Sequence, residues 1–332
     1  MTNRITEQTF EKAGKELEKL LFPVELGEVF VKTPFYPEGF QSNYFNAVVA
    51  HLPNQLPKIF SVVTDNYRLV SNEEAIYIGK EIYRELFNQV NPSEIKPFKV
   101  IYPNTLSYCH IQLVHQKVNF EVWEQETWMP FIQVTNSYNR TFALTFELGF
   151  VRSLNSSGVI FRKKTANLKS SHNKTNVLKW MLNISSKELN TLQMEFVAYM
   201  KNLKRFYVDP TYIMPLVCKA FGFHFKEDKR LFVEIHSENE NLDQLEELRT
   251  VVDRLANHYF AELGHNAYAA FNVLADLISN ESDRVSKFNN FSLHSSSYYY
   301  KPTEWLYDFM DRIQRTDFNM EEYLREYLKY GG

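Results

Sequence analysis

The chain has 332 residues, of which 44% are hydrophobic and 15% aromatic, and its 37 Lys and Arg against 40 Asp and Glu give a formal net charge of −3. This composition excludes a disordered tail, a collagen-like repeat and a disulfide-stapled miniprotein. The length allows one large domain or two ordinary ones, each able to bury a core. The first residues contain no apolar signal region, and no stretch approaches the roughly 18 apolar residues of a membrane span. We therefore expect a cytoplasmic protein with no membrane partner.

The chain has two cysteines, Cys109 and Cys218. Two are too few for a disulfide framework or a cysteine-based zinc site. Each stands among apolar residues, which predicts a buried thiol.

The first part of the chain predicts a helix followed by strands. Apolar residues spaced by three and four over residues 6–22 indicate an amphipathic helix that ends at Pro23. Short β-rich runs follow, at residues 45–52 and 59–64, and several prolines separate them. Such runs are typical of strands joined by turns.

The next part predicts a helix and then a larger sheet. The helix begins near Ser71 or Asn72, either of which can cap it, and stops at residues 91–92. Residues 98–161 are dominated by β-branched and aromatic side chains, with turn-forming residues at 136–139 and 155–158. This pattern predicts an antiparallel sheet of several strands.

The second half of the chain is mostly helical in pattern. A short β-like run at residues 231–235 and a Ser- and Asn-rich loop at 279–297 interrupt it. Helix-period segments lie at residues 178–206, 210–221, 242–263, 266–278, 304–313 and 321–330. Strands first and helices later predict an α+β fold, with an antiparallel sheet in the N-terminal half packed against a predominantly helical C-terminal half.

Three regions follow from these patterns. Residues 1–27 are expected to form an N-terminal amphipathic helix, residues 28–187 a β-rich α+β core, and residues 188–332 a helical region packed on that core.

Charge is distributed unevenly along the chain. Residues 148–187 contain no Asp or Glu but eight Lys and Arg, so the remainder of the chain carries −3 − 8 = −11. A 40-residue window of one sign attracts polyanions, and nucleic acid is the commonest polyanion of a cytosol. The alternative is a solvated basic face whose lysines protect a sheet edge from pairing.

A second candidate surface is the aromatic and basic stretch at residues 287–301, because aromatic rings beside cations hold single strands without sequence preference. The alternative is that residues 298–300 are a buried strand. The candidate nucleic-acid contacts are Arg140, Arg152, Arg162, Lys163, Lys164, Lys169, His172, Lys174, Lys179, Tyr298 and Tyr299. The even numbers of Arg140, Arg152 and Arg162 place them on one face of the sheet if no bulge intervenes.

Histidines do not predict a metal centre. His110 and His115 are five apart in an expected strand, so they point to opposite faces. His258, Glu262 and His265 lie on one helical stripe, and Glu262 with His265 matches a Glu-x-x-His element. A di-iron bundle needs a second such element, which the sequence lacks. A hydrogen-bonded stripe is therefore the preferred interpretation.

Common enzyme signatures are absent from the sequence: His-Glu-x-x-His, Gly-x-Ser-x-Gly, Walker A and Gly-x-Gly-x-x-Gly. We accordingly expect no cofactor. An alternative enzyme site is a carboxylate group in which Glu124 and Glu126, with Asp65 or Glu147, hold Mg²⁺ for phosphodiester hydrolysis. The competing interpretation is that these are ordinary solvent-facing acids.

Four segments in order resemble one family. Residues 60–75 (FSVVTDNYRLVSNEEA), 134–144 (VTNSYNRTFAL), 149–158 (GFVRSLNSSG) and 266–274 (NAYAAFNVL) are similar to motifs of the phage/plasmid-like domain of unknown function 932. The likeness covers about residues 28–300. The family commonly has Cys-x-Asn-Gly where this chain has residues 155–158 (NSSG), and Gly where it has Arg140. The resemblance implies a protein of mobile genetic elements and supplies no catalytic residues.

The sequence thus favours a mobile-element protein that binds nucleic acid, single-stranded or processed DNA, through a basic surface without sequence readout. Two alternatives stay open. One is a metal-dependent enzyme acting on nucleic acid, and the other is a protein-interaction module in phage defence or anti-defence. Self-association into a homo-oligomer is also left open.

Overall fold

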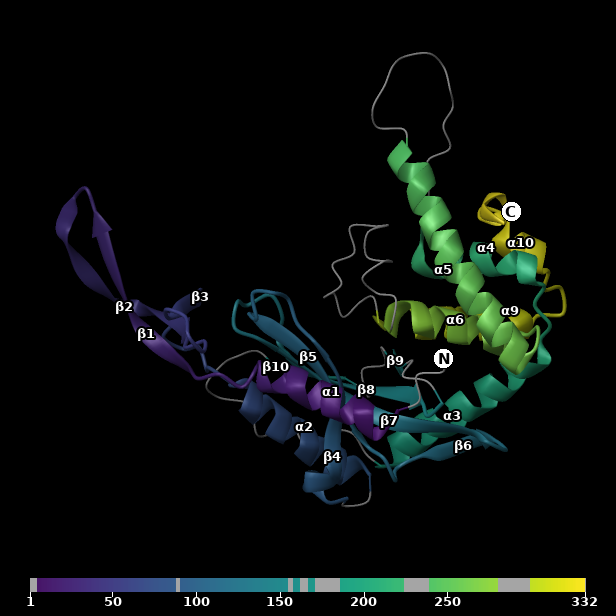
Figure 1. The fold of residues 1–332 in the computed structure, drawn as a ribbon, viewed down its shortest axis with the longest axis horizontal. Coiled ribbons are helices and arrows are strands. Elements are labelled where there is room, and N and C mark those ends of the chain that lie inside the picture. Colours follow the sequence, from purple (N-terminus) through teal and green to yellow (C-terminus); the bar gives the residue numbers. More distant parts are fainter. Residues whose placement is uncertain are drawn as a thin grey trace, which may run out of the picture.

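A computed structural model describes residues 5–87, 90–154, 158–161, 167–170, 186–223, 239–279 and 299–331. The N-terminal half contains α1 (Glu7–Glu18), β1 (Val24–Thr33), β2 (Tyr36–Ala50), β3 (Lys58–Thr64), α2 (Asn72–Leu86), β4 (Ile95–Ile101), β5 (Tyr108–His115), β6 (Phe120–Trp123), β7 (Glu126–Ser137), β8 (Leu144–Arg152), β9 (Gly158–Ile160) and β10 (Asn167–Ser170). The C-terminal half contains α3 (Ser186–Arg205), α4 (Ile213–Phe221), α5 (Asn239–Leu263), α6 (Ala267–Ser279), α9 (Lys301–Ile313) and α10 (Met320–Leu324). The predicted α+β class is confirmed (Figure 1).

Within the described residues the strands form two antiparallel sheets. The smaller has the order β1-β2-β3. The larger has seven strands in the order β10-β8-β7-β5-β4, with β6 paired to β7 and β9 paired to β8. Both sheets come from the N-terminal half. Their strands can follow one another closely in the chain, because antiparallel strands can be joined by short turns.

Helix α2 lies against the larger sheet. Ser71 caps it, because the Ser71 Oγ accepts a hydrogen bond of 3.0 Å from the Glu74 amide. A Cβ on Gly79 would stand 2.5 Å from Val134 Cγ2 of β7 and 3.2 Å from Leu113 Cδ1 of β5. The missing side chain at Gly79 therefore allows the helix to approach the strands closely.

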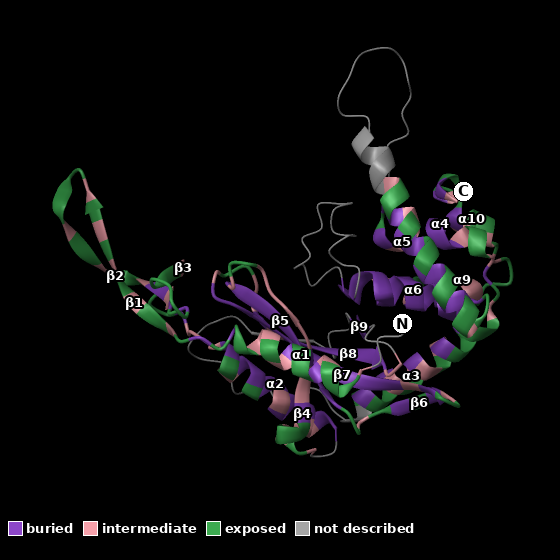
Figure 2. Ribbon diagram, in the orientation of Figure 1, coloured by how far each residue is buried: buried purple, intermediate pink, exposed green. Residues whose placement is uncertain are grey.

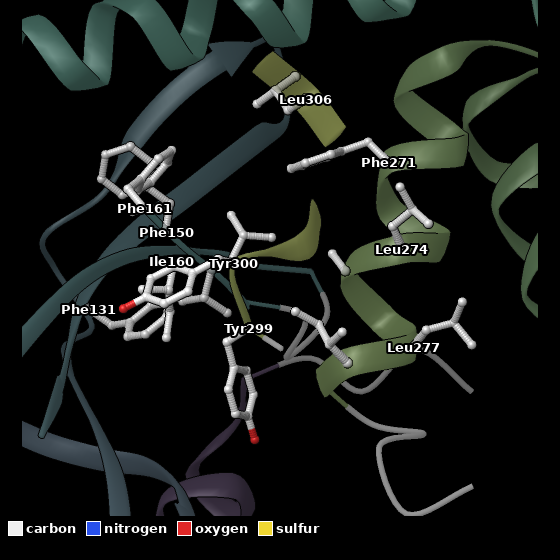
Figure 3. Close-up of a cluster of buried hydrophobic side chains, with 14 of the residues drawn as sticks. Phe131, Phe150, Ile160, Phe161, Phe271, Leu274, Leu277, Tyr299, Tyr300 and Leu306 are labelled. Carbon is white, nitrogen blue, oxygen red and sulfur yellow. The ribbon is translucent and has the colours of Figure 1, made fainter. Parts of the chain in front are cut away.

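The C-terminal helices complete the core. Every residue of α6 is buried. In Figure 3, Phe271 of α6 and Leu306 of α9 lie beside Phe150 and Phe161 of the sheet region, and the Phe150 and Phe161 rings are 4.9 Å apart. Burial of these apolar side chains favours packing of the two halves against each other. None of the helices, within the described ranges, is long and apolar enough to cross a membrane.

The smaller sheet is an arm. Strands β1 and β2 form a hairpin that projects from the body of the molecule (Figure 1), and its outer part is exposed (Figure 2). A separate small core holds its base, where Phe22, Val48 and Val63 pack with Tyr138 from the end of β7. The rings of Phe60 and Tyr138 are stacked at 5.8 Å.

One local prediction differs from the structure, and a second falls only partly on described residues. The turn expected at residues 136–139 begins later, because Asn136 and Ser137 are the last residues of β7 and the Tyr138 amide donates to the Ser107 carbonyl. Of the expected helix at 178–206, the described part begins at Ser186. The β-like run at 231–235 and nearly all of the loop at 279–297 lie outside the described residues.

Candidate functional site

The predicted nucleic-acid contacts divide into two groups. Arg140, Arg152, Lys169 and Tyr299 lie within the described residues. The rest fall outside them: Arg162, Lys163, Lys164, His172, Lys174, Lys179 and Tyr298.

The prediction that Arg152 contacts nucleic acid is wrong. Its side chain is 1% exposed, and its Nε and Nη2 donate to the two carboxylate oxygens of Glu126 at 2.6 and 2.7 Å. Nη2 also donates to Glu262 of α5 at 2.7 Å. The remaining nitrogen, Nη1, is buried and has no hydrogen-bond partner among the described residues, so burial of this fork-to-fork pair keeps a phosphate away from the guanidinium.

The surroundings of Arg152 hold its charge in place. Burial acts to lower the pKa of the guanidinium, but hydrogen bonds and negative charge from Glu126 outweigh it and the pKa stands above its usual value. The Tyr268 hydroxyl donates to Glu126 at 2.6 Å and accepts from the Trp128 indole at 3.2 Å. This cluster joins β7 and β8 to α5 and α6, which is a structural role.

Tyr299 is also misassigned as a surface contact. Its side chain is 2% exposed, with its ring centroid 6.4 Å from that of His110. Figure 3 shows Tyr299 and Tyr300 within the buried cluster. A buried ring cannot stack on a base without opening the core. The alternative of a buried strand is therefore right about burial but wrong about the strand, because Tyr299 is helical.

Arg140 and Lys169 remain as described candidates. Arg140 is exposed in the connection between β7 and β8, where its φ of 65° is left-handed, and its Nη1 lies 3.4 Å from the Val62 carbonyl. Lys169 lies in β10, the edge strand of the larger sheet, and pairs with Thr145 of β8.

The expectation that Arg140 and Arg152 share a face of the sheet is wrong. Arg140 lies outside any strand, whereas Arg152 ends β8. A parity argument requires an uninterrupted strand between the residues, and the connection between β7 and β8 breaks it.

The carboxylates proposed for Mg²⁺ do not form one site. Glu126 is engaged by Arg152 and Tyr268. Glu147 is engaged elsewhere, by Gln133 at 2.9 Å and by the hydroxyl of Tyr300. Within the ranges that the structure describes, no group of three or more His, Cys, Asp or Glu side chains could hold a metal ion.

Glu147 instead ends a polar row that crosses the sheet. Gln112, Gln133 and Glu147 stand opposite one another on β5, β7 and β8. The Gln112 amide donates to the Gln133 carbonyl oxygen at 2.9 Å, and the Gln133 amide donates to Glu147 at 2.9 Å. All three side chains are at most 3% exposed. One face of the sheet therefore contains a continuous chain of buried hydrogen bonds.

A second polar pair lies beside this row. His110 and Thr135 are register partners on β5 and β7, and the His110 Nδ1 lies 2.8 Å from the Thr135 hydroxyl. Because a buried carboxylate and a buried imidazole share this face, it holds proton-accepting groups away from water. The sequence analysis missed this group. The sequence pattern that indicates this group is a set of polar residues at alternate positions of otherwise apolar strands.

His110 and His115 behave as their spacing predicts, but the predicted helical stripe does not include His265, because α5 ends at Leu263 and Gly264 has a φ of 84°. His115 turns away from His110 and lies 2.9 Å from Glu94. His258 lies 3.6 Å from Glu262 as a helical pair, while His265 follows the end of α5. Glu262 is shared with Arg152, so this stripe stabilises the helix-to-sheet contact.

A pocket on the surface is also not a polyanion site. It has a volume of about 500 Å³ and lies at the C-terminal end, around Arg312, Arg315 and Arg325. Each of these arginines pairs with an acid one helical turn away, at 3.5, 2.8 and 3.1 Å respectively. Its charge is therefore internally balanced.

Comparison with known proteins adds no relative. No protein-family model matches the chain, and neither a curated protein nor a solved structure matches it. Function must be argued from the residues themselves.

Proposed function

We propose that this protein binds nucleic acid, preferentially single-stranded or processed DNA, through the basic window at residues 148–187 and without sequence readout. The observation that carries the proposal is the acid-free run of charge. With Arg152 neutralised by Glu126, 8 − 1 = 7 bases of the window remain, still with no acid. Seven bases in a stretch of sequence that contains no acid favour a polyanion.

Within the described part of this window, residues 148–152 and 158–161 are buried, and β10 reaches an edge of the larger sheet. The described parts of the window are the end of β8, β9, β10 and the beginning of α3. Strand β10 is the edge strand of the larger sheet, so one side of it has no hydrogen-bonded strand within the described ranges. Arg140 is exposed and lies in the connection between β7 and β8, before the window in the chain. The remaining proposed contacts are Arg140, Arg162, Lys163, Lys164, Lys169, His172, Lys174, Lys179 and Tyr298.

The origin of the protein belongs to the same proposal. We take the four motif segments as support for a source in phages, plasmids or integrated elements, where single-stranded DNA arises during replication and transfer. The buried environment of Glu126 gives no support to the metal-dependent enzyme that uses it.

The test is fluorescence anisotropy of labelled single-stranded DNA, duplex DNA and RNA with the purified full chain at several salt concentrations. We expect the logarithm of the association constant to fall linearly with the logarithm of the salt concentration. In the variant R162A/K163A/K164A, loss of three phosphate contacts should lower the slope by about 2 for a single strand.

The matched control removes the same charge elsewhere. K12A/K15A/K201A neutralises three exposed lysines on α1 and α3, outside the window. It should bind like the parent chain. Absence of binding at low salt, or equal losses in both triple variants, would overturn the proposal.

A further inference from the structure

Arg140 has a backbone conformation that favours glycine. Its φ is 65°, in the left-handed region, which is unfavourable for a residue with a Cβ. Gln125 has a similar φ of 67°, but it lies in the tight turn between the register partners Trp123 and Glu126. Tight hairpin turns require left-handed residues, whereas a connection as long as residues 138–143 can be built without one. The conformation of Arg140 is therefore imposed by contacts of its own turn.

The side chain of Asn139 holds this turn together. Its Oδ1 accepts from the Ser137 hydroxyl at 2.7 Å and from the Thr141 amide at 3.1 Å, so it bridges the chain before and after Arg140. Its Nδ2 donates to the Ser107 hydroxyl at 3.0 Å. These three hydrogen bonds tie the turn to the connection between β4 and β5.

Tyr138 fixes the same turn to the rest of the fold. Its amide donates to the Ser107 carbonyl at 2.8 Å, and its carbonyl accepts from the Ser61 hydroxyl at 2.7 Å. Its own hydroxyl accepts from the Asn72 amide at 2.8 Å. The backbone just before Arg140 is thus held by β3, by the β4–β5 connection and by the start of α2.

The side chain of Arg140 adds little to this framework. It is exposed, and its guanidinium forms no ion pair with any residue that the structure describes. Its Nη1 lies 3.4 Å from the Val62 carbonyl, which is long for a hydrogen bond. An arginine here is therefore strained without a compensating contact in the fold. Strained residues that the surrounding structure holds in place are typical of functional sites.

The turn lies beside the basic window in space. Strand β8 begins at Leu144, and Leu144 pairs with Ser170, the last residue of β10. The turn over residues 138–143 is therefore at the end of the larger sheet at which β10 also ends. A phosphate backbone that follows this edge strand passes within reach of Arg140.

We propose that Arg140 is a pre-positioned phosphate contact and that Asn139 is the residue that positions it. The proposal rests on the nucleic-acid binding proposed above and deepens it by naming one anchoring contact. The planar guanidinium can donate two parallel hydrogen bonds to a phosphate. Because the turn is already ordered, binding there loses less conformational freedom than at a contact that must first be ordered.

The first experiment compares R140G with the parent chain, using labelled single-stranded DNA at several salt concentrations. Glycine relieves the left-handed strain, so the midpoint of urea unfolding should not fall below that of the parent. Loss of a charge-assisted contact should weaken binding by about tenfold and should lower the salt slope by about 0.7.

The matched control is Q125G. It places glycine at the other exposed left-handed residue, in the turn between β6 and β7, and removes no charge. It should bind DNA like the parent chain.

Two further variants separate position from charge. R140K keeps the charge and loses the planar fork, whereas N139A keeps every charge and removes the three hydrogen bonds of the Asn139 side chain. Each should raise the dissociation constant by about threefold or more and leave the salt slope unchanged. N202A, at an exposed asparagine of α3, should change neither quantity.

The outcomes distinguish this inference from the proposed function. If the parent chain binds DNA but R140G or N139A binds equally well, the anchoring role is wrong and the basic window stands. A lower unfolding midpoint for R140G would contradict the strain on which the inference depends. Absence of binding by the parent chain would overturn both proposals.

Discussion

The side chain of Asn72, the first residue of α2, accepts a hydrogen bond of 2.9 Å from the amide of Asn136 near the end of β7. Asn72 also donates to the Leu20 carbonyl at 3.0 Å and accepts from the Cys109 thiol at 3.3 Å. Its backbone amide donates to the Tyr138 hydroxyl at 2.8 Å. One buried residue thus connects the end of α1, the start of α2 and the sheet.

We expect N72A to lower the free energy of unfolding by about 2–4 kcal/mol, because it leaves buried groups of several segments without partners. Urea unfolding followed by circular dichroism measures this. Exposed Asn202 on α3 offers the control N202A, which should change stability by less than about 0.5 kcal/mol. Equal effects of the two substitutions would contradict a structural role for Asn72.

The Arg152–Glu126 pair should show strong coupling. R152M and E126Q should each destabilise by about 3–5 kcal/mol, because each leaves a buried group without its partner. The double variant should cost less than the two singles together, by about 1–3 kcal/mol in a double-mutant cycle. The exposed Arg325–Glu322 pair is the control and should couple by less than about 1 kcal/mol. An additive cycle for Arg152 and Glu126 would be evidence against the buried pair.

The polar row of Gln112, Gln133 and Glu147 predicts a variant whose stability depends on pH. Q133E places a second carboxylate beside Glu147, and two buried carboxylates cannot both ionise easily. One of them must keep a proton in the folded state. The free energy of unfolding of Q133E should therefore fall further below that of the parent as pH rises from 4 to 7. Urea unfolding at several pH values measures it. Q116E, at an exposed position, should show no such growth.

The cysteines predict loss of stability at alkaline pH. Burial raises the pKa of both Cys109 and Cys218 to about 12, so the folded state holds protons that the unfolded thiols release near pH 9. Stability is therefore complete below pH 9 and falls as pH rises toward 12. Thermal melts from pH 8 to 11 should show the fall, and C109A/C218A should make it shallower. Burial also raises the pKa of Tyr67 and Tyr108 to about 12, and it raises the pKa of other tyrosines such as Tyr83 and Tyr138, so part of the slope should remain in that variant.

The same thiols should be chemically protected. A thiol reagent at pH 8 should leave the folded chain unmodified and should label both cysteines in guanidinium chloride. Rapid labelling of the native chain would show that the thiols are accessible.

The sequence by itself determined the α+β class and the buried cysteines, and it limited the cap of α2 to Ser71 or Asn72, of which the structure shows Ser71. Periodicity, capping and local polarity are properties of neighbouring residues, so they can be read without knowing the fold. It also showed the acid-free window, since charge composition needs no coordinates.

Only the tertiary structure decided what Arg152, Tyr299 and Glu126 do. A basic residue in a basic window suggests a surface contact, yet Arg152 meets Glu126 across two strands and Glu262 of α5, which lies 110 residues away in sequence. The polar row of Gln112, Gln133 and Glu147 likewise depends on strand register. Register and long-range pairing arise from the packing of the whole chain, so local pattern does not specify them.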